Sequence, residues 1–181
     1  MTSFVKRVVL GVCGSIAAYK AADIIRRFQE KNCDVTVVMT KEAEEFITPL
    51  TLATLSGKGV YQDMFARNEN GQAWEMGHIE LSKADAIVIA PATANVIGKM
   101  ASGLADDFLT TLLIATRAPV FVAPAMNEKM YLNKIVQENC AKLKKHGVKF
   151  IDPVKGKLAC GIIGVGHLAE AEDIVKIVLK S

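Results

Sequence analysis

The sequence contains few aromatic residues and little net charge. Phenylalanine, tryptophan and tyrosine together make up 6% of its 181 residues. The 22 lysines and arginines nearly balance the 19 aspartates and glutamates, which leaves a formal charge of +3. Because strong positive charge is typical of proteins that bind nucleic acid or anionic membranes, neither kind of partner is indicated.

Long apolar runs and paired cysteine motifs are also missing. No apolar run approaches the ~20 residues of a membrane-spanning helix. The apolar stretch after Arg7 is interpreted as a strand and a glycine turn rather than a signal peptide, so a cytoplasmic location is expected. The cysteines form no CxxC pair or zinc-like Cys/His cluster, so neither a metal site nor a disulfide is expected. The default interpretation of each is a small buried hydrophobe: Cys13, Cys33, Cys140 and Cys160.

The sequence does contain a regular alternation of apolar strands and amphipathic helices. With a hydrophobic content of 51%, it predicts a single α/β domain over residues 1–181. The expected fold has three layers and is Rossmann-like (flavodoxin-like), with a six-stranded parallel sheet. The strands are predicted at 7–12, 34–40, 59–63, 85–90, 118–123 and 148–151. The helices are predicted at 15–31, 42–47, 49–56, 94–102, 106–116, 128–146 and 169–180, with another opening near His78.

Polar and glycine-rich segments follow the carboxyl ends of these strands. Because parallel strands end on one rim of the sheet, the segments are expected to converge on a ligand site. After the last strand comes a glycine-rich stretch of roughly 16 residues that includes "PVKGKLACG", and loops of such length are usually functional or disordered. Its glycines would let it bend and close over a ligand.

The turn after the first strand indicates the class of ligand. "GVCGSIAAYK" leads a glycine turn into a helix N-terminus, which offers backbone N–H groups to a phosphate. It is not the dinucleotide fingerprint GxGxxG. The second strand ends at Thr40 and Lys41, where an NAD site favours an acidic residue. The pattern therefore favours FMN over a dinucleotide.

Five motifs in order carry a family resemblance: "GSIAAYK", "MGHIEL", "PATAN", "PAMNEKM" and "LACGIIGVG". Together they resemble the homo-oligomeric flavin-containing cysteine decarboxylases, and among them the 4'-phosphopantothenoylcysteine decarboxylases of coenzyme A biosynthesis. The resemblance implies bound FMN at a subunit interface, in a trimer or in a dodecamer of four trimers. It implies loss of CO2 from 4'-phosphopantothenoylcysteine to give 4'-phosphopantetheine. A phosphopantothenoylcysteine synthetase, fused or separate, is the implied partner.

The resemblance also implies roles for individual residues. His78 resembles the active-site base, and Cys160 resembles the proton donor that completes reduction of the enethiol intermediate. Asn127 resembles the ligand of the substrate carboxylate, with Met126 beside it. Lys157 and Ala159 lie on the implied substrate flap. The implied FMN contacts are Gly14, Ser15, Ile16, Thr40, Thr93, Ala94, Asn95 and Ala125.

Other interpretations of these residues remain open. His78 fits a capping or core histidine, and Asn127 fits a helix N-cap. His167 stands where many relatives carry arginine, which leaves its role open. The alternative functions are a peptidyl-cysteine oxidative decarboxylase, which lacks the reducing cysteine, and a non-catalytic regulatory flavoprotein. The presence of Cys160 favours the coenzyme A enzyme.

Overall fold

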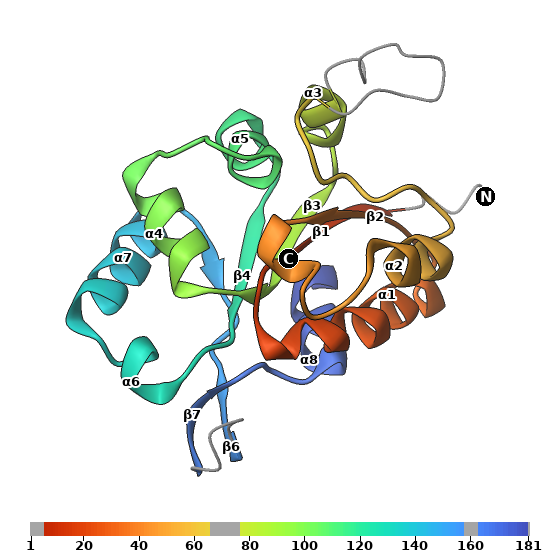
Figure 1. The fold of residues 1–181 in the computed structure, drawn as a ribbon. Helices are drawn as coiled ribbons and strands as arrows, with labels where there is room; N and C mark the ends of the chain where they lie inside the picture. The colour runs from red at the N-terminus through yellow and green to blue at the C-terminus, as the bar shows by residue number, and fades with distance from the viewer. Residues whose placement is uncertain (1–5, 66–76, 158–162, 181) are drawn as a thin grey trace.

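A five-stranded parallel sheet forms the centre of the protein. The computed structural model describes residues 6–65, 77–157 and 163–180 (Figure 1). Its strand order is β2-β1-β3-β4-β5, and every neighbouring pair is parallel. The strands are β1 (Lys6–Val12), β2 (Cys33–Met39), β3 (Ala86–Ala92), β4 (Val120–Pro124) and β5 (Lys149–Phe150).

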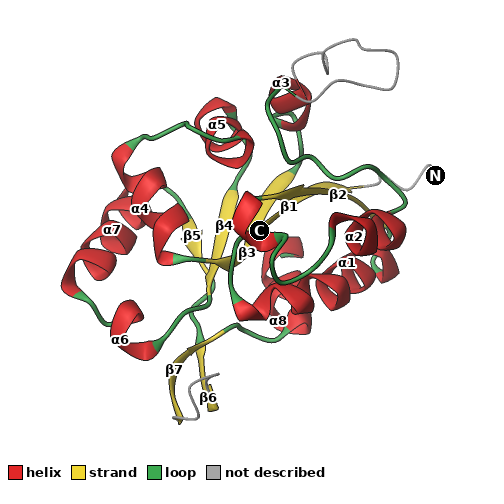
Figure 2. Ribbon diagram, viewed as in Figure 1, coloured by secondary structure: helices red, strands yellow, loops and turns green. Residues whose placement is uncertain are grey.

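Helices cover both faces of this sheet, as the continuous apolar runs predict (Figure 2). One face packs against α1 (Ala21–Glu30), α2 (Pro49–Ser56) and α8 (Ala171–Leu179). The other packs against α4 (Ala94–Ser102), α5 (Phe108–Ala115) and α7 (Lys134–Lys145). The three-layer Rossmann-like α/β fold is therefore confirmed.

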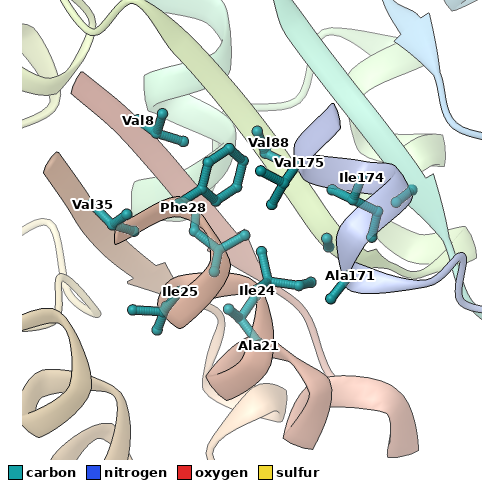
Figure 3. Packing of buried hydrophobic residues seen from close by; sticks show 14 of the residues in the cluster. Val8, Ala21, Ile24, Ile25, Phe28, Val35, Val88, Ala171, Ile174 and Val175 are labelled. Atoms are coloured by element: carbon teal, nitrogen blue, oxygen red, sulfur yellow. The ribbon is translucent and has the colours of Figure 1, made fainter. Parts of the chain in front are cut away.

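Alternate residues of β1 contribute to two separate cores. Val8, Leu10 and Val12 face α1 and α8, whereas Val9 faces the α4 and α5 layer. In the first core, Phe28 of α1 is fully buried and packs near Val8 and Val175 (Figure 3). Burial on both faces explains why β3, with sequence AIVIAPA, has no exposed residue.

The crossovers leave β1 and β3 towards opposite faces of the sheet. β1 continues into α1 on one face, and β3 continues into α4 on the other. The segments that follow β1 and β3 therefore separate beyond the carboxyl ends of these adjacent strands. Open α/β sheets bind ligands at such a switch point. The predicted site rim lies at this switch point.

The predicted strand at 59–63 is wrong, so the sheet has five strands rather than six. Only Tyr61 pairs, through a single parallel bridge to Val38 at the edge of β2. Tyr61 N donates to Val37 O at 3.0 Å, and Met39 N donates to Tyr61 O at 2.9 Å. The flanking residues Gly59, Gln62 and Asp63 are exposed, so they bury no apolar face that would extend the pairing.

The predicted helix at 128–146 is divided into α6 (Glu128–Tyr131) and α7. Asn133 causes the division, because its side chain accepts a hydrogen bond from Ile135 N at 2.9 Å and caps a new helix. Leu132 and Ile135, on either side of Asn133, are 59% and 68% exposed.

Two other predicted helices contain 3-10 turns: one begins with such a turn, and the other consists of one alone. The helix predicted at 15–31 starts as η1 (Ile16–Lys20) before α1, and the one predicted at 42–47 is only η2 (Lys41–Ala43). The helix near His78 is the short α3 (Gly77–Leu81). Within the described residues, none of the helices has the length and apolar character that a membrane span requires.

The long glycine-rich stretch contains a second, antiparallel sheet. It pairs β6 (Val154–Lys157) with β7 (Ile163–His167). The expectation of a loop without structure is therefore wrong for these residues. The glycines hid the pattern, because Gly156 pairs with Gly164 and neither has a side chain that shows strand alternation.

Candidate functional site

A cleft of about 680 Å³ opens at the carboxyl ends of β1, β3 and β4. Its walls come from segments far apart in the sequence, those following β1, β2, β3 and β4 and the end of β7. Its size is typical of a site for a small molecule or cofactor. All of the predicted flavin contacts line it: Gly14, Ser15, Ile16, Thr40, Thr93, Ala94, Asn95 and Ala125.

The turn after β1 is held tightly against the segment after β2. A Cβ on Gly14 would lie 2.9 Å from the backbone C and O atoms of Glu42, so only glycine fits without a shift. Ser15 then caps η1, because its Oγ accepts from Ala17 N at 3.3 Å. The same hydroxyl donates to Ala125 O at 3.3 Å, which ties this turn to the chain leaving β4.

Thr40 carries the clearest sign of a missing polar partner. Its Oγ1 is shielded from solvent and has no hydrogen-bond partner among the described residues. Thr40 also lines the cleft. Leaving a buried hydroxyl unpaired costs about 1–3 kcal/mol, so a polar group of a ligand that reaches Oγ1 would be stabilised there.

The N-terminus of α4 faces the same cleft. Thr93 caps the helix, and its Oγ1 accepts from Val96 N at 3.4 Å. The first backbone N–H groups of a helix have no intrahelical acceptor, and the helix dipole is positive at this end. Thr93, Ala94 and Asn95 therefore form a wall that favours phosphate or other polar oxygen atoms.

Asn127 and Met126 line the cleft together with the predicted flavin contacts. Asn127 is also the N-cap of α6, where its Oδ1 accepts from Lys129 N at 2.9 Å. The capping interpretation is thus confirmed, and it fixes the side-chain amide at the cleft. A carboxamide held in this way can donate to an anionic group of a ligand.

No role was assigned from the sequence to the charged residues of the cleft. Lys99 lies 2.8 Å from Asp106 and 2.9 Å from Asp107, and these hydrogen bonds raise the pKa of Lys99. Asp107 caps α5; burial opposes its ionisation, yet hydrogen bonds from Thr110 N and Lys99 lower its pKa overall. Lys20 Nζ lies 3.0 Å from His167 Nε2, and both line the cleft. No local pattern marks these lysines, because lysine is usually solvated.

The structure places His78 outside the group of residues that line the cleft. Its ring packs edge-on against Phe108, with ring centroids 6.4 Å apart. Phe108 follows Asp107, which does line the cleft, so His78 contacts α5 next to a residue of the cleft. Lys157 lies in β6, Ile163 begins β7, and Ala159 and Cys160 lie outside the described residues.

Three cysteines are free and buried, as their default interpretation predicts: Cys13, Cys33 and Cys140. Cys13 precedes Gly14, and burial raises the pKa of its thiol to about 12. A thiol of that pKa remains protonated at neutral pH and is a poor nucleophile. Its place beside the cleft therefore reflects packing rather than chemistry.

Comparison with known proteins identifies the family. Residues 2–181 match the flavoprotein family. The chain is 48% identical to the coenzyme A biosynthesis bifunctional protein CoaBC of Vibrio vulnificus over 94% of its length, and 46% identical to that of Bacillus subtilis over 97%. It spans about two fifths of these curated relatives, 42% and 43% of their lengths.

Solved structures agree with this assignment over the whole chain. A mutant PPC decarboxylase complexed with pantothenoylaminoethenethiol is 34% identical, with a TM-score of 0.85 and 98% coverage of both chains. The FMN-binding protein AtHal3 is 34% identical, with a TM-score of 0.81 over 98% of this chain and 96% of that one. The FMN-dependent cysteine decarboxylase SpaF is 30% identical, with a TM-score of 0.80 over 97% and 96%. The chain therefore belongs to the flavoprotein family.

Proposed function

We propose that this chain is an FMN-dependent decarboxylase that converts 4'-phosphopantothenoylcysteine to 4'-phosphopantetheine in coenzyme A biosynthesis. The observation that carries the proposal is the cleft, where every predicted flavin contact meets Asn127 and Met126. The matching PPC decarboxylase structure and the CoaBC relatives support the substrate. A cytoplasmic location follows from this metabolic role.

The residues of the cleft fit FMN in size and in chemistry. Thr40 offers a hydroxyl that needs a polar partner, and α4 offers its positive N-terminus. The absence of a Cβ at Gly14 keeps the turn after β1 compact. When bound, a flavin supplies a reversible acceptor for two electrons, which the substrate needs because a simple amino acid has no electron sink for decarboxylation.

The protein contributes binding, orientation and proton transfer. Asn127, fixed as the cap of α6, would hold the substrate carboxylate by donating from its amide. His78 would remove a proton from the substrate as its thiol side is oxidised, and Cys160 would return a proton to carbon during reduction. Lys157 and Ala159 would contact the substrate, as the family resemblance implies.

The position of His78 supports a site shared between copies of the chain. Among the described residues, His78 does not line the cleft of its own chain, so if His78 is the base it would serve the cleft of a second copy. Exposed apolar side chains lie at the cleft, as such an interface requires. Ile16 and Tyr19 are each 59% exposed, and Met130 is 49% exposed. We propose a homo-oligomer, either a trimer or a dodecamer of four trimers, that works with a fused or separate synthetase.

A peptidyl-cysteine oxidative decarboxylase is the alternative. The likeness to SpaF, an FMN-dependent cysteine decarboxylase, favours it. The two functions differ in the fate of the electrons, since the alternative enzyme stops at the oxidised enethiol. The presence of Cys160 in the sequence favours the enzyme that returns the electrons.

The direct test supplies 4'-phosphopantothenoylcysteine to the purified, FMN-loaded protein. We expect CO2 and 4'-phosphopantetheine in equal amounts, measured by gas release and mass spectrometry. A peptide ending in cysteine serves as the comparison substrate. A yellow protein that releases no CO2 from the phosphopantothenoyl substrate, or that acts only on the peptide, would contradict the proposal.

Replacing Cys160 tests its role as proton donor. We expect Cys160→Ser to bind FMN and release CO2 but to accumulate the enethiol, because a serine hydroxyl is a much weaker acid than a thiol. The ratio of enethiol to phosphopantetheine is measured by mass spectrometry. Cys33→Ser, buried at the start of β2 and therefore at the end of the sheet opposite the cleft, is the matched control. An unchanged product ratio in Cys160→Ser would rule out the role.

Removing the Thr40 hydroxyl tests the fit of the flavin. We expect Thr40→Val to weaken FMN binding by about tenfold, the usual net effect of one hydrogen bond. The apoprotein should unfold at the same or a higher denaturant concentration, because an unpaired buried hydroxyl has been removed. Flavin fluorescence measures binding, and circular dichroism measures unfolding. Unchanged affinity for FMN, or a destabilised apoprotein, would contradict this account of Thr40.

A further inference from the structure

Lys20 and His167 form a basic pair on the β7 side of the cleft. Lys20 ends η1, His167 ends β7, and both line the cleft. Lys20 Nζ lies 3.0 Å from His167 Nε2 and 3.5 Å from a carboxylate oxygen of Glu170. The Lys20 side chain is only 16% exposed, so its ammonium group is largely withdrawn from bulk water.

The two lysines of the cleft differ in how they are neutralised. Lys99 is held by Asp106 and Asp107 within 2.9 Å, so its charge is already compensated by two carboxylates. Lys20 has one, Glu170, at 3.5 Å, and that side chain is 65% exposed. Because an exposed carboxylate is screened by water, it neutralises a lysine weakly. Among the described residues that line the cleft, Lys20 is therefore the lysine with charge left for a ligand.

Contacts with α6 fix His167 in place. Met126 N donates to Gly166 O at 3.0 Å, and Val165 N donates to Glu128 Oε1 at 3.0 Å. Gly166 has a φ of +136°, and the carbonyl of Met126 occupies the space that its Cβ would need. The backbone of β7 immediately before His167 is thus bonded to α6 and to Met126, the residue two positions before α6.

We infer that Lys20, oriented by His167, binds a phosphate monoester in the cleft. An ammonium group has three N–H donors, so Lys20 can bond His167 and Glu170 and still donate to a phosphate oxygen. A phosphate monoester carries close to two negative charges at neutral pH, which suits a shielded cation. The inference rests on the proposed function, in which both the flavin and the substrate carry such a phosphate.

The experiment compares each phosphate ester with its dephosphorylated form in Lys20→Met. FMN and riboflavin affinities are measured by flavin fluorescence, and kcat/KM is measured with phosphopantothenoylcysteine and pantothenoylcysteine. For one of the two pairs, the affinity or kcat/KM of the phosphorylated molecule should fall about 10- to 100-fold more than that of its dephosphorylated form. This is the usual effect of one hydrogen bond to a charged group. The pair affected identifies whether the phosphate belongs to flavin or substrate. Lys20→Arg, which keeps the charge, should recover much of the loss.

Controls separate this site from general effects. Lys142→Met removes the same charge from the exposed side of α7. It should change neither the ratio of FMN to riboflavin affinity nor the ratio of kcat/KM for the two substrates. Lys20→Gln makes the same comparison if the methionine variant does not fold. The inference would be overturned if Lys20→Met lowered affinity or kcat/KM equally for the phosphorylated and dephosphorylated molecules, or lowered neither. If the unaltered protein turns over neither substrate, the proposed function fails, while the comparison of FMN with riboflavin still tests Lys20.

Discussion

The site depends on the crossovers that follow β1 and β3, which lead to opposite faces of the sheet. These strands are neighbours in the sheet, yet β1 leads into α1 on one face and β3 leads into α4 on the other. Two parallel strands whose continuations separate leave a space at their carboxyl ends that no helix fills. The cleft occupies this space, and the turn after β1 and the N-terminus of α4 form two of its walls. Residues distant in the sequence become neighbours there because the topology places their strands side by side.

Hydrogen bonds across the opening then fix the walls. Ser15 bonds Ala125, which joins the turn after β1 to the end of β4. Met126 bonds Gly166, which joins the same chain to β7. The positions of Asn127 and His167 follow from these two links, because each residue is next to a bonded one. A catalytic site gains from such preorganisation, since groups already in place need not be ordered when the ligand binds.

The sequence was most informative where the structure obeys a local rule. Alternation predicted the buried strands, and all of the residues that the motifs suggest as flavin contacts line one cleft. It was least informative where a tertiary contact decides the outcome. The prediction of a strand at 59–63 was wrong because only Tyr61 pairs with the sheet edge. The prediction of one helix at 128–146 was wrong because Asn133 caps the start of a second helix there. Lys20 ends the motif GSIAAYK, but its pairing was not predicted because His167 is distant in the chain.

In the proposed function a second copy completes the cleft, because among the described residues Asn127 lines the cleft of its own chain and His78 does not. The most direct measurement is complementation between His78→Asn and Asn127→Asp chains that are co-expressed and purified together. Each variant alone should bind FMN but release little CO2. Random assembly should restore about a quarter of the sites, each with His78 from one chain and Asn127 from another. If the mixed oligomers remain as inactive as the separate variants, a cleft shared in this way is contradicted.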